Sequence, residues 1–137
     1  MTLFYLDSSA LVKLVRAEPA TDALRAFLAN ADLLSSELAL TEVPRAIHRV
    51  AALDRSLAPE PLLTRTGEVL DAVALLPVDR SLLAAAGALE EPMLRALDAI
   101  HLVTAIDLLP IDAFVSYDER QSAAARLAGL RTVQPGV

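Results

Sequence analysis

Two aspartates stand directly after segments that have the pattern of buried strands. Asp7 follows "LFYL" and Asp118 follows "AFVSY". In an open parallel sheet, ligands bind at the carboxyl ends of the strands, so we expect both side chains at one edge of the sheet. They would share a crevice if the two strands are neighbours. The alternative is that each aspartate caps the next helix, which is the weaker explanation for Asp7 because Ser8 and Ser9 also offer capping hydroxyls.

Two further acids lie within apolar helical patterns. Asp98, in "ALDAIHLVTA", has Leu94 and Leu102 one helical turn away, and Glu42 lies in "ALTEVPRA". A carboxylate in such surroundings loses hydration unless a cation or a hydrogen bond compensates it. Ordinary alternatives exist for both residues. Asp98 could cap a helix that begins at Ala99, and Glu42 could be exposed to solvent.

Together these acids predict a particular chemistry. Clustered carboxylates raise one another's pKa values unless a cation neutralises them. Hard oxygen ligands favour Mg²⁺, or Mn²⁺ as the second candidate, over Zn²⁺, in keeping with a chain that has no cysteine and only two histidines. Such metals can ionise a water and stabilise the leaving oxygen of a phosphodiester. We therefore predict that Asp7 is placed at the end of its strand to hold a metal.

The elements that must position these acids alternate between short apolar runs and helical periodicity, as in an α/β domain. Pro44 would kink its helix unless the regular part begins near Thr41. Strands separated by helices pair in parallel through right-handed crossovers, so we expect a three-layer α/β/α sandwich with a central parallel sheet. The expected strands are 3–6, 32–36, 76–78, 112–118 and 131–133, and the expected helices are 8–16, 20–31, 37–54, 58–76, 81–91, 94–109 and 119–129.

Length and composition limit the class of protein. The 137 residues suit one compact domain, and a hydrophobic fraction of 55% supports burial on both faces of a sheet. No apolar run approaches the roughly 18–20 residues that span a bilayer, and "MTLFYLD" lacks the basic flank of a secretory signal. The absence of cysteine excludes disulfides and thiol catalysis. We expect a cytoplasmic protein without a membrane partner.

The net charge of −6 argues by itself against a nucleic-acid partner, which usually requires a basic surface. However, acids that hold divalent cations repel phosphate much less than their count implies. An RNA partner is therefore compatible with this charge.

Four motifs carry a resemblance to a known family. They are "YLDSSALVKL", "SELALTEVPRA", "LRALDAIHLVTA" and "FVSYDERQSAAARLAGL". In this order and spacing, over essentially the whole chain, they resemble the PIN-domain family, and most closely the VapC toxins of bacterial toxin–antitoxin pairs. The resemblance implies a single PIN domain over residues 1–137 and a divalent-metal-dependent endoribonuclease that cleaves RNA. It also implies a cognate VapB-like antitoxin, a homodimer and a toxin–antitoxin hetero-oligomer.

Carried over by motif, the acidic quartet of the family falls on Asp7, Glu42, Asp98 and Asp118. The resemblance implies that Asp7 and Asp98 are the central metal ligands. Glu42 would bind the metal or its waters, and Asp118 would complete the site. Some relatives have another acid two residues after the last aspartate. This chain has Arg120 at that position, which puts a fully occupied second metal site in doubt.

Several other side chains could support the site. Ser116 matches a family hydroxyl that binds phosphate or orients a carboxylate. Ser9 could donate a hydrogen bond to a carboxylate or a metal-bound water, or could cap the first helix. His101 is expected to be a packed or hydrogen-bonded structural histidine rather than a general base. Two or three of six cationic residues are expected along an RNA path, namely Lys13, Arg16, Arg45, Arg49, Arg95 and Arg120.

Other function classes fail at particular residues. A haloacid-dehalogenase-type phosphatase needs an aspartate where Ser9 stands, and a response-regulator receiver needs a late lysine, whereas the only lysine is Lys13. A dinucleotide fold needs a glycine-rich turn, which "DSSALVKL" lacks. The remaining alternative is a catalytically inactive PIN fold that binds RNA or protein. Exposed apolar faces on the helices at 8–30 and 37–75 are the expected dimer and antitoxin contacts.

Overall fold

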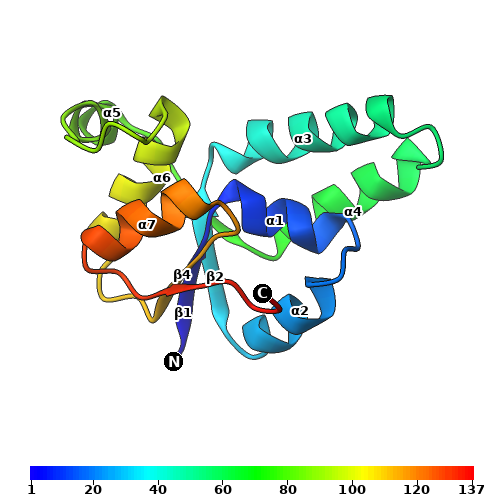
Figure 1. The fold of residues 1–137 in the computed structure, drawn as a ribbon, viewed down its shortest axis with the longest axis horizontal. Coiled ribbons are helices and arrows are strands. Elements are labelled where there is room, and N and C mark those ends of the chain that lie inside the picture. Colours follow the sequence, from blue (N-terminus) through cyan, green and yellow to red (C-terminus); the bar gives the residue numbers. More distant parts are fainter.

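The centre of the molecule is a five-stranded sheet in which all neighbouring strands are parallel (Figure 1). The computed structural model describes all of residues 1–137. The strands lie in the order β3–β2–β1–β4–β5, so β1 and β4 are neighbours although most of the chain separates them. Their bounds are Leu3–Leu6 for β1, Asp32–Ser36 for β2, Ala74–Leu76 for β3, Ala113–Val115 for β4 and Thr132–Val133 for β5.

Seven helices cover the two faces of this sheet (Figure 1). Helices α1 to α4 pack on one face, and α5 to α7 form the other layer. This arrangement confirms the predicted three-layer α/β/α sandwich. The helix bounds are Ser8–Val15 for α1, Thr21–Leu28 for α2, Ala39–Leu53 for α3, Pro59–Asp71 for α4, Arg80–Gly87 for α5, Ala96–Asp107 for α6 and Glu119–Leu127 for α7.

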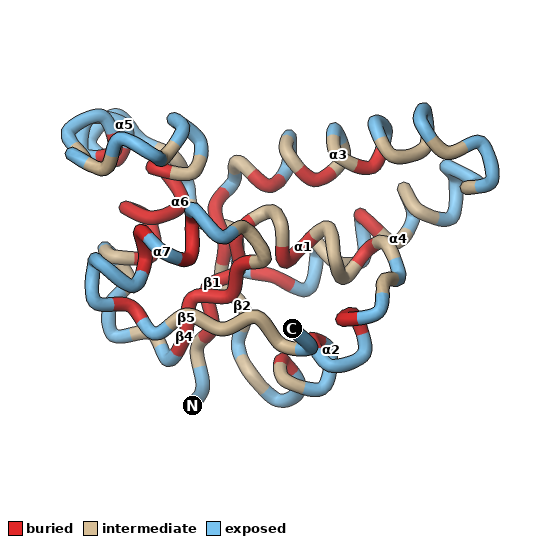
Figure 2. Tube along the Cα trace, in the orientation of Figure 1, coloured by how far each residue is buried: buried red, intermediate tan, exposed pale blue.

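Side-chain alternation along β1 divides the core between the two layers. Phe4 and Leu6 point to the α1–α4 side, where Phe4 stacks on Phe27 with ring centroids 4.6 Å apart. Tyr5 points to the opposite side and stacks on Phe114 at 5.5 Å. The buried segments in Figure 2 accordingly follow the strands and the inward faces of α1, α6 and α7. Burial on both faces explains why these strands read as apolar runs.

The structure corrects several bounds of the predicted elements. The third strand spans Ala74–Leu76, earlier than the expected 76–78, because pairing with β2 starts at Ala74. The helix with Pro44 begins at Ala39, between the expected start at residue 37 and the alternative start near Thr41, so the proline lies inside it. Helix α6 begins at Ala96, with Arg95 as its N-cap residue. None of the helices is both long enough and apolar enough to cross a membrane.

The parallel pairing of β1 and β4 places the acids. Leu6 is in register with Val115, and the backbone N–H of Asp7 donates to the carbonyl of Val115 at 3.1 Å. The two strands therefore end at the same edge of the sheet. The prediction that Asp7 and Asp118 lie at one edge is confirmed.

Candidate active site

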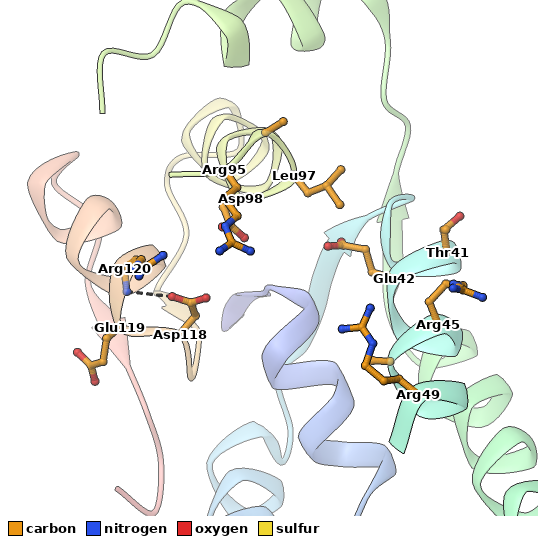
Figure 3. Close-up of a pocket in the computed structure, with 12 residues that line it drawn as sticks. Thr41, Glu42, Arg45, Arg49, Arg95, Leu97, Asp98, Asp118, Glu119 and Arg120 are labelled. Carbon is orange, nitrogen blue, oxygen red and sulfur yellow. Dashed lines mark hydrogen bonds between the residues drawn. The ribbon is translucent and has the colours of Figure 1, made fainter. Parts of the chain in front are cut away.

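A cleft of about 900 Å³ opens at this edge of the sheet (Figure 3). Three of the four predicted acids line it, each from the first turn or the N-cap of a different helix. Glu42 comes from α3, Asp98 from α6 and Asp118 from the N-cap of α7. In Figure 3 the carboxylates of Asp98 and Asp118 lie on one side of the cleft, and that of Glu42 points toward them from the other. Helix N-termini carry partial positive charge, which partly offsets the repulsion among these acids.

Asp7 is not among the residues that line the cleft, because it is almost completely buried, with 4% of its surface exposed. Its Oδ1 accepts hydrogen bonds from the Ser9 hydroxyl at 2.6 Å and from the backbone N–H of Ala10 at 3.1 Å. Its Oδ2 accepts from the Ser116 hydroxyl at 2.6 Å. The capping role considered weaker for Asp7 is therefore present. Burial raises the pKa of Asp7, and these hydrogen bonds offset only part of that effect.

The two serines join the first and last sequence motifs. Ser9 donates to Asp7 and accepts the backbone N–H of Tyr117 at 2.9 Å. Ser116 donates to Asp7 and accepts the backbone N–H of Asp118 at 3.1 Å. The expected hydrogen bond from Ser9 to a carboxylate is confirmed. Both hydroxyls stabilise the ionised form of a carboxyl that has no cation paired with it.

Replacing Ser116 by alanine should weaken cleavage by about 10-fold, as is typical when a residue that supports a ligand is lost. The change removes the donor to Oδ2 of Asp7, so the pKa of Asp7 should rise further and its ionised form should be harder to maintain. The free energy of unfolding should fall by about 1–2 kcal/mol. Initial cleavage rates in Mn²⁺ and thermal unfolding are the measurements.

The matched control for Ser116→Ala is Thr66→Val. Thr66 is a buried residue of α4 whose hydroxyl donates to the carbonyl of Leu62 at 2.8 Å, outside the cleft. The Thr66→Val variant should be less stable than the wild type but should cleave RNA at the wild-type rate. A wild-type rate in Ser116→Ala would show that Asp7 does not need this hydroxyl.

Asp98 and Asp118 face each other across the N-termini of α6 and α7. Asp98 lies in the first turn of α6, so the alternative that it caps a helix beginning at Ala99 is wrong. Burial raises the pKa of Asp98, and the nearby charge of Asp118 raises it further. Asp118 caps α7 by accepting the N–H groups of Arg120 at 2.9 Å and Gln121 at 3.2 Å. The amide of Gln121 donates to the carbonyl of Asp98 at 3.1 Å and so ties the two helix ends together.

Glu42 is held by two hydrogen-bond partners at the same oxygen. Ser8 donates to Oε1 at 2.6 Å, and Nε2 of His101 lies 2.7 Å from it. Burial raises the pKa of Glu42, but the hydrogen bonds from His101 and the Ser8 hydroxyl outweigh it, so the pKa lies below its ordinary value. His101 is buried and hydrogen-bonded, so the prediction of a packed, hydrogen-bonded histidine is confirmed.

Four of the six candidate cations line the cleft. They are Arg45, Arg49, Arg95 and Arg120. None of these guanidinium groups makes an ion pair in the structure. Lys13 is instead paired with Glu18 at 3.3 Å and lies 4.5 Å from the centre of the Tyr117 ring. The cleft thus combines acids at its centre with free cationic groups on both walls (Figure 3).

The donor set of the cleft fits a hard divalent cation. Glu42, Asp98 and Asp118 supply only carboxylate oxygens, the donors that Mg²⁺ and Mn²⁺ prefer. A cation would also relieve the repulsion that raises the pKa of Asp98. In this structure no three acidic or histidine side chains are gathered in metal-binding geometry. Binding would therefore draw these carboxylates closer together.

Sequence patterns did not identify the residues that support the acids through hydrogen bonds, either directly or through His101. Ser8 was expected only as a capping hydroxyl, yet it donates to Glu42. Tyr5 was expected only as a buried strand residue, yet its hydroxyl lies 2.8 Å from Nδ1 of His101. Gln121 carried no expectation, although its side chain reaches Asp98. A polar residue in an apolar pattern is the one signal available, and it does not identify the partner.

Comparison with known sequences finds a matching family model and similar proteins over nearly the whole chain. The family model described as the PIN domain matches residues 4–127. Ribonuclease VapC46 of Mycobacterium tuberculosis is 41% identical over 137 residues, which cover 98% of this chain and 99% of that protein. Ribonuclease VapC35 of the same species is 38% identical over 140 residues, with 98% of both chains covered.

Comparison with solved structures bears on the fold. Mycobacterium tuberculosis VapC20, described as a sarcin-ricin loop cleaving toxin, superposes with a TM-score of 0.71 at 18% identity, over 96% of this chain and 99% of that one. VapBC2 of Rickettsia felis, bound to a DNA fragment from its promoter, gives a TM-score of 0.71 at 14% identity, over 98% and 99%. Both share the three-layer architecture of this chain.

Proposed function

This chain belongs to the PIN-domain family, and we propose that it is the toxin of a type II toxin–antitoxin pair, a ribonuclease that cleaves RNA internally with Mg²⁺ or Mn²⁺. The full-length VapC ribonuclease relatives support RNA cleavage. The observation that carries the metal-dependent mechanism is the convergence of three acids from three helix N-termini on one cleft, with unpaired arginines on its walls. We propose that residues 1–137 act as a single PIN domain.

Each acid has a proposed role in that reaction. Asp7 and Asp98 would be the central metal ligands, Glu42 would hold the cation or its waters, and Asp118 would complete the site. When bound, the cation would ionise a water and stabilise the leaving oxygen of the phosphodiester. The hydroxyls of Ser9 and Ser116 would keep Asp7 oriented and ionised, as their hydrogen bonds to it suggest.

The walls of the cleft would position the RNA. The arginines present fork-shaped donors that match phosphate oxygens. Arg120 occupies the position at which some family members have an acid, so we propose that it contacts phosphate there and that a second metal is weakly held. The few aromatic residues, 4% of the chain, favour recognition by shape and backbone rather than by base stacking.

The proposed partners follow from the same relationships. The VapBC2 neighbour supports an antitoxin partner, and an RNA substrate implies the cytoplasm. A homodimer, and a hetero-oligomer with the antitoxin, would bury apolar side chains left exposed in α3. Leu40 and Leu53 are 51% and 82% exposed there.

The test is metal-dependent cleavage of a structured RNA pool by the purified, antitoxin-free protein. Cleavage should occur in Mg²⁺ or Mn²⁺, disappear with EDTA and return when excess Mn²⁺ is added. Asp98→Asn should slow it by about 10²-fold, the scale of losing one pre-organised electrostatic group. Asp107→Asn, an exposed acid at the other end of the same helix, is the matched control and should cleave normally.

Two outcomes would contradict this proposal. Cleavage that survives EDTA would exclude the metal-dependent mechanism. No cleavage, together with no Mn²⁺ bound in calorimetry, would favour the PIN fold that only binds RNA or protein. Mn²⁺ bound without cleavage would instead indicate that the RNA pool lacks the substrate.

A further inference from the structure

A buried chain of hydrogen bonds runs from the sheet to the edge of the cleft. The hydroxyl of Tyr5, in β1, lies 2.8 Å from Nδ1 of His101, in α6. Nε2 of the same imidazole lies 2.7 Å from Oε1 of Glu42, in α3. Tyr5 is 0% exposed and His101 is 1% exposed, so water does not compete for these bonds. These hydrogen bonds connect three elements that are distant in sequence, and they end on a carboxylate that lines the cleft.

The single hydrogen of the Tyr5 hydroxyl determines which groups donate along this series of hydrogen bonds. A phenol is protonated at neutral pH and has a single hydrogen to donate. Nδ1 of His101 is the one hydrogen-bond partner of the Tyr5 hydroxyl, so this buried O–H is satisfied only when it donates to Nδ1. The neutral imidazole then carries its own hydrogen on Nε2, where it faces Glu42. The opposite tautomer would turn a lone pair toward the carboxylate. Tyr5 therefore selects the tautomer in which His101 donates to Glu42.

Both donors to Glu42 hold the same oxygen. Ser8 donates to Oε1 at 2.6 Å, and Nε2 of His101 also lies 3.2 Å from the Ser8 hydroxyl, so the three groups form a tight cluster. Oε2 of Glu42 makes no hydrogen bond to protein groups. The carboxylate is held at one oxygen while the other is free, and Figure 3 shows the group directed across the cleft toward Asp98.

We infer that His101 is a positioning residue which fixes the carboxylate of Glu42 so that its free oxygen faces the cation of the cleft. Tyr5 acts through His101 by fixing its tautomer. The inference rests on the proposed metal site, because it assigns Glu42 a cation to face. Residues that orient a ligand in this way typically contribute 10- to 100-fold to metal affinity or activity.

A purely structural role for His101 makes different predictions. The imidazole also packs edge-on against Tyr5, with ring centroids 5.9 Å apart, and this contact would stabilise the fold in any case. A packing role would be reflected in the melting temperature alone. A positioning role requires a donor at the place of Nε2 and changes the metal affinity of the folded protein.

The experiment is calorimetric titration of Mn²⁺ into the metal-free, antitoxin-free protein, with melting temperatures measured on the same samples. His101→Leu should raise the dissociation constant for Mn²⁺ by about 10- to 100-fold. His101→Gln should recover most of the affinity, because its amide N–H can donate to Glu42 in place of Nε2. Tyr5→Phe should raise the constant several-fold, since the imidazole then loses its fixed tautomer. Thr66→Val should melt earlier with unchanged affinity.

The outcomes separate this inference from the proposed function. If the wild type binds Mn²⁺ and His101→Leu binds it equally well, His101 does not position Glu42, although the metal site stands. Equal loss in His101→Gln and His101→Leu would also overturn the inference, even if His101→Leu folds poorly. If the wild type binds no Mn²⁺, the proposed metal site fails and this inference fails with it.

Discussion

Asp7→Asn should lower the rate of RNA cleavage by about 10³-fold or more and, at the same time, make the metal-free protein more stable. The catalytic loss is expected because an uncharged amide binds a hard cation more weakly than a carboxylate does in the proposed role of central ligand. The gain in stability, about 1 kcal/mol, is expected because the folded chain buries this carboxylate without a paired cation. Asparagine keeps the shape and can still accept from Ser9 and from the N–H of Ala10.

The pH dependence of this stability difference has a definite sign. Burial raises the pKa of Asp7 in the folded protein above its ordinary value of 3.8. The folded state therefore holds this proton more tightly than the unfolded chain does. As pH rises from about 3.8 through the folded pKa, the contribution of Asp7 to the free energy of unfolding falls. The difference between Asp7→Asn and wild type should be small near pH 4 and largest at neutral pH.

Thermal unfolding of the metal-free proteins across this pH range measures the effect. Asp7→Asn should melt about 3–5 °C above wild type at neutral pH. Adding Mn²⁺ should stabilise the wild type and not the variant, because a ligand stabilises only the state that binds it. Asp79→Asn is the matched control, since Asp79 also caps a helix, α5, by accepting the N–H of Leu82 at 2.8 Å. An Asp7→Asn protein that is less stable than wild type at neutral pH would show that the carboxylate is already compensated.

The position of Asp7 and Asp118 at one edge of the sheet could be predicted from two local rules. Apolar runs alternating with helical periodicity predict a parallel sheet, and such a sheet binds ligands beyond the carboxyl ends of its strands. Asp7 and Asp118 both follow strands, so their common edge requires no knowledge of the tertiary structure. That β1 and β4 are neighbours could not be predicted in this way. It depends on the strand order, which local patterns do not encode.

The surroundings of the acids could not be predicted, for a physical reason. The bond between Ser8 and Glu42 joins residues 34 positions apart, and that between Tyr5 and His101 joins residues 96 positions apart. Such partners are chosen by packing in three dimensions, whereas capping preferences and helical spacing act over a few residues. The same limit explains why Asp98 was a candidate cap, since the start of α6 at Ala96 depends on its packing rather than on a local signal.

The observed capping by Asp7 and Asp118 is compatible with their proposed role in metal binding, because capping and ligand binding use different electron pairs. A carboxylate has about four acceptor sites, and a helix cap occupies only one or two of them. Asp118 uses Oδ1 for both backbone N–H groups of α7. Its other oxygen makes no hydrogen bond to the protein and can face the cleft. An acid that caps a helix at the end of a strand is therefore not excluded from catalysis.

The arginines that line the cleft are expected to contribute strongly to RNA binding. Arg45 and Arg49 are one turn apart on α3, line the cleft and make no ion pair. If each neutralises one phosphate, Arg45→Ala/Arg49→Ala should reduce the slope of log affinity against log salt by about 1.4, at roughly 0.7 per single-strand contact. At 0.1 M salt this corresponds to a loss of about 25-fold in affinity.

Binding is best measured in the Asp7→Asn background, where the RNA should remain intact. Arg65→Ala/Arg80→Ala removes the same charge from outside the cleft and is the matched control. Because the whole chain carries a net charge of −6, a general electrostatic effect would weaken both double variants alike. A large loss confined to Arg45→Ala/Arg49→Ala would place the RNA backbone along α3. Equal losses would mean that the arginines act only through net charge, and that the RNA takes a path that does not touch this wall.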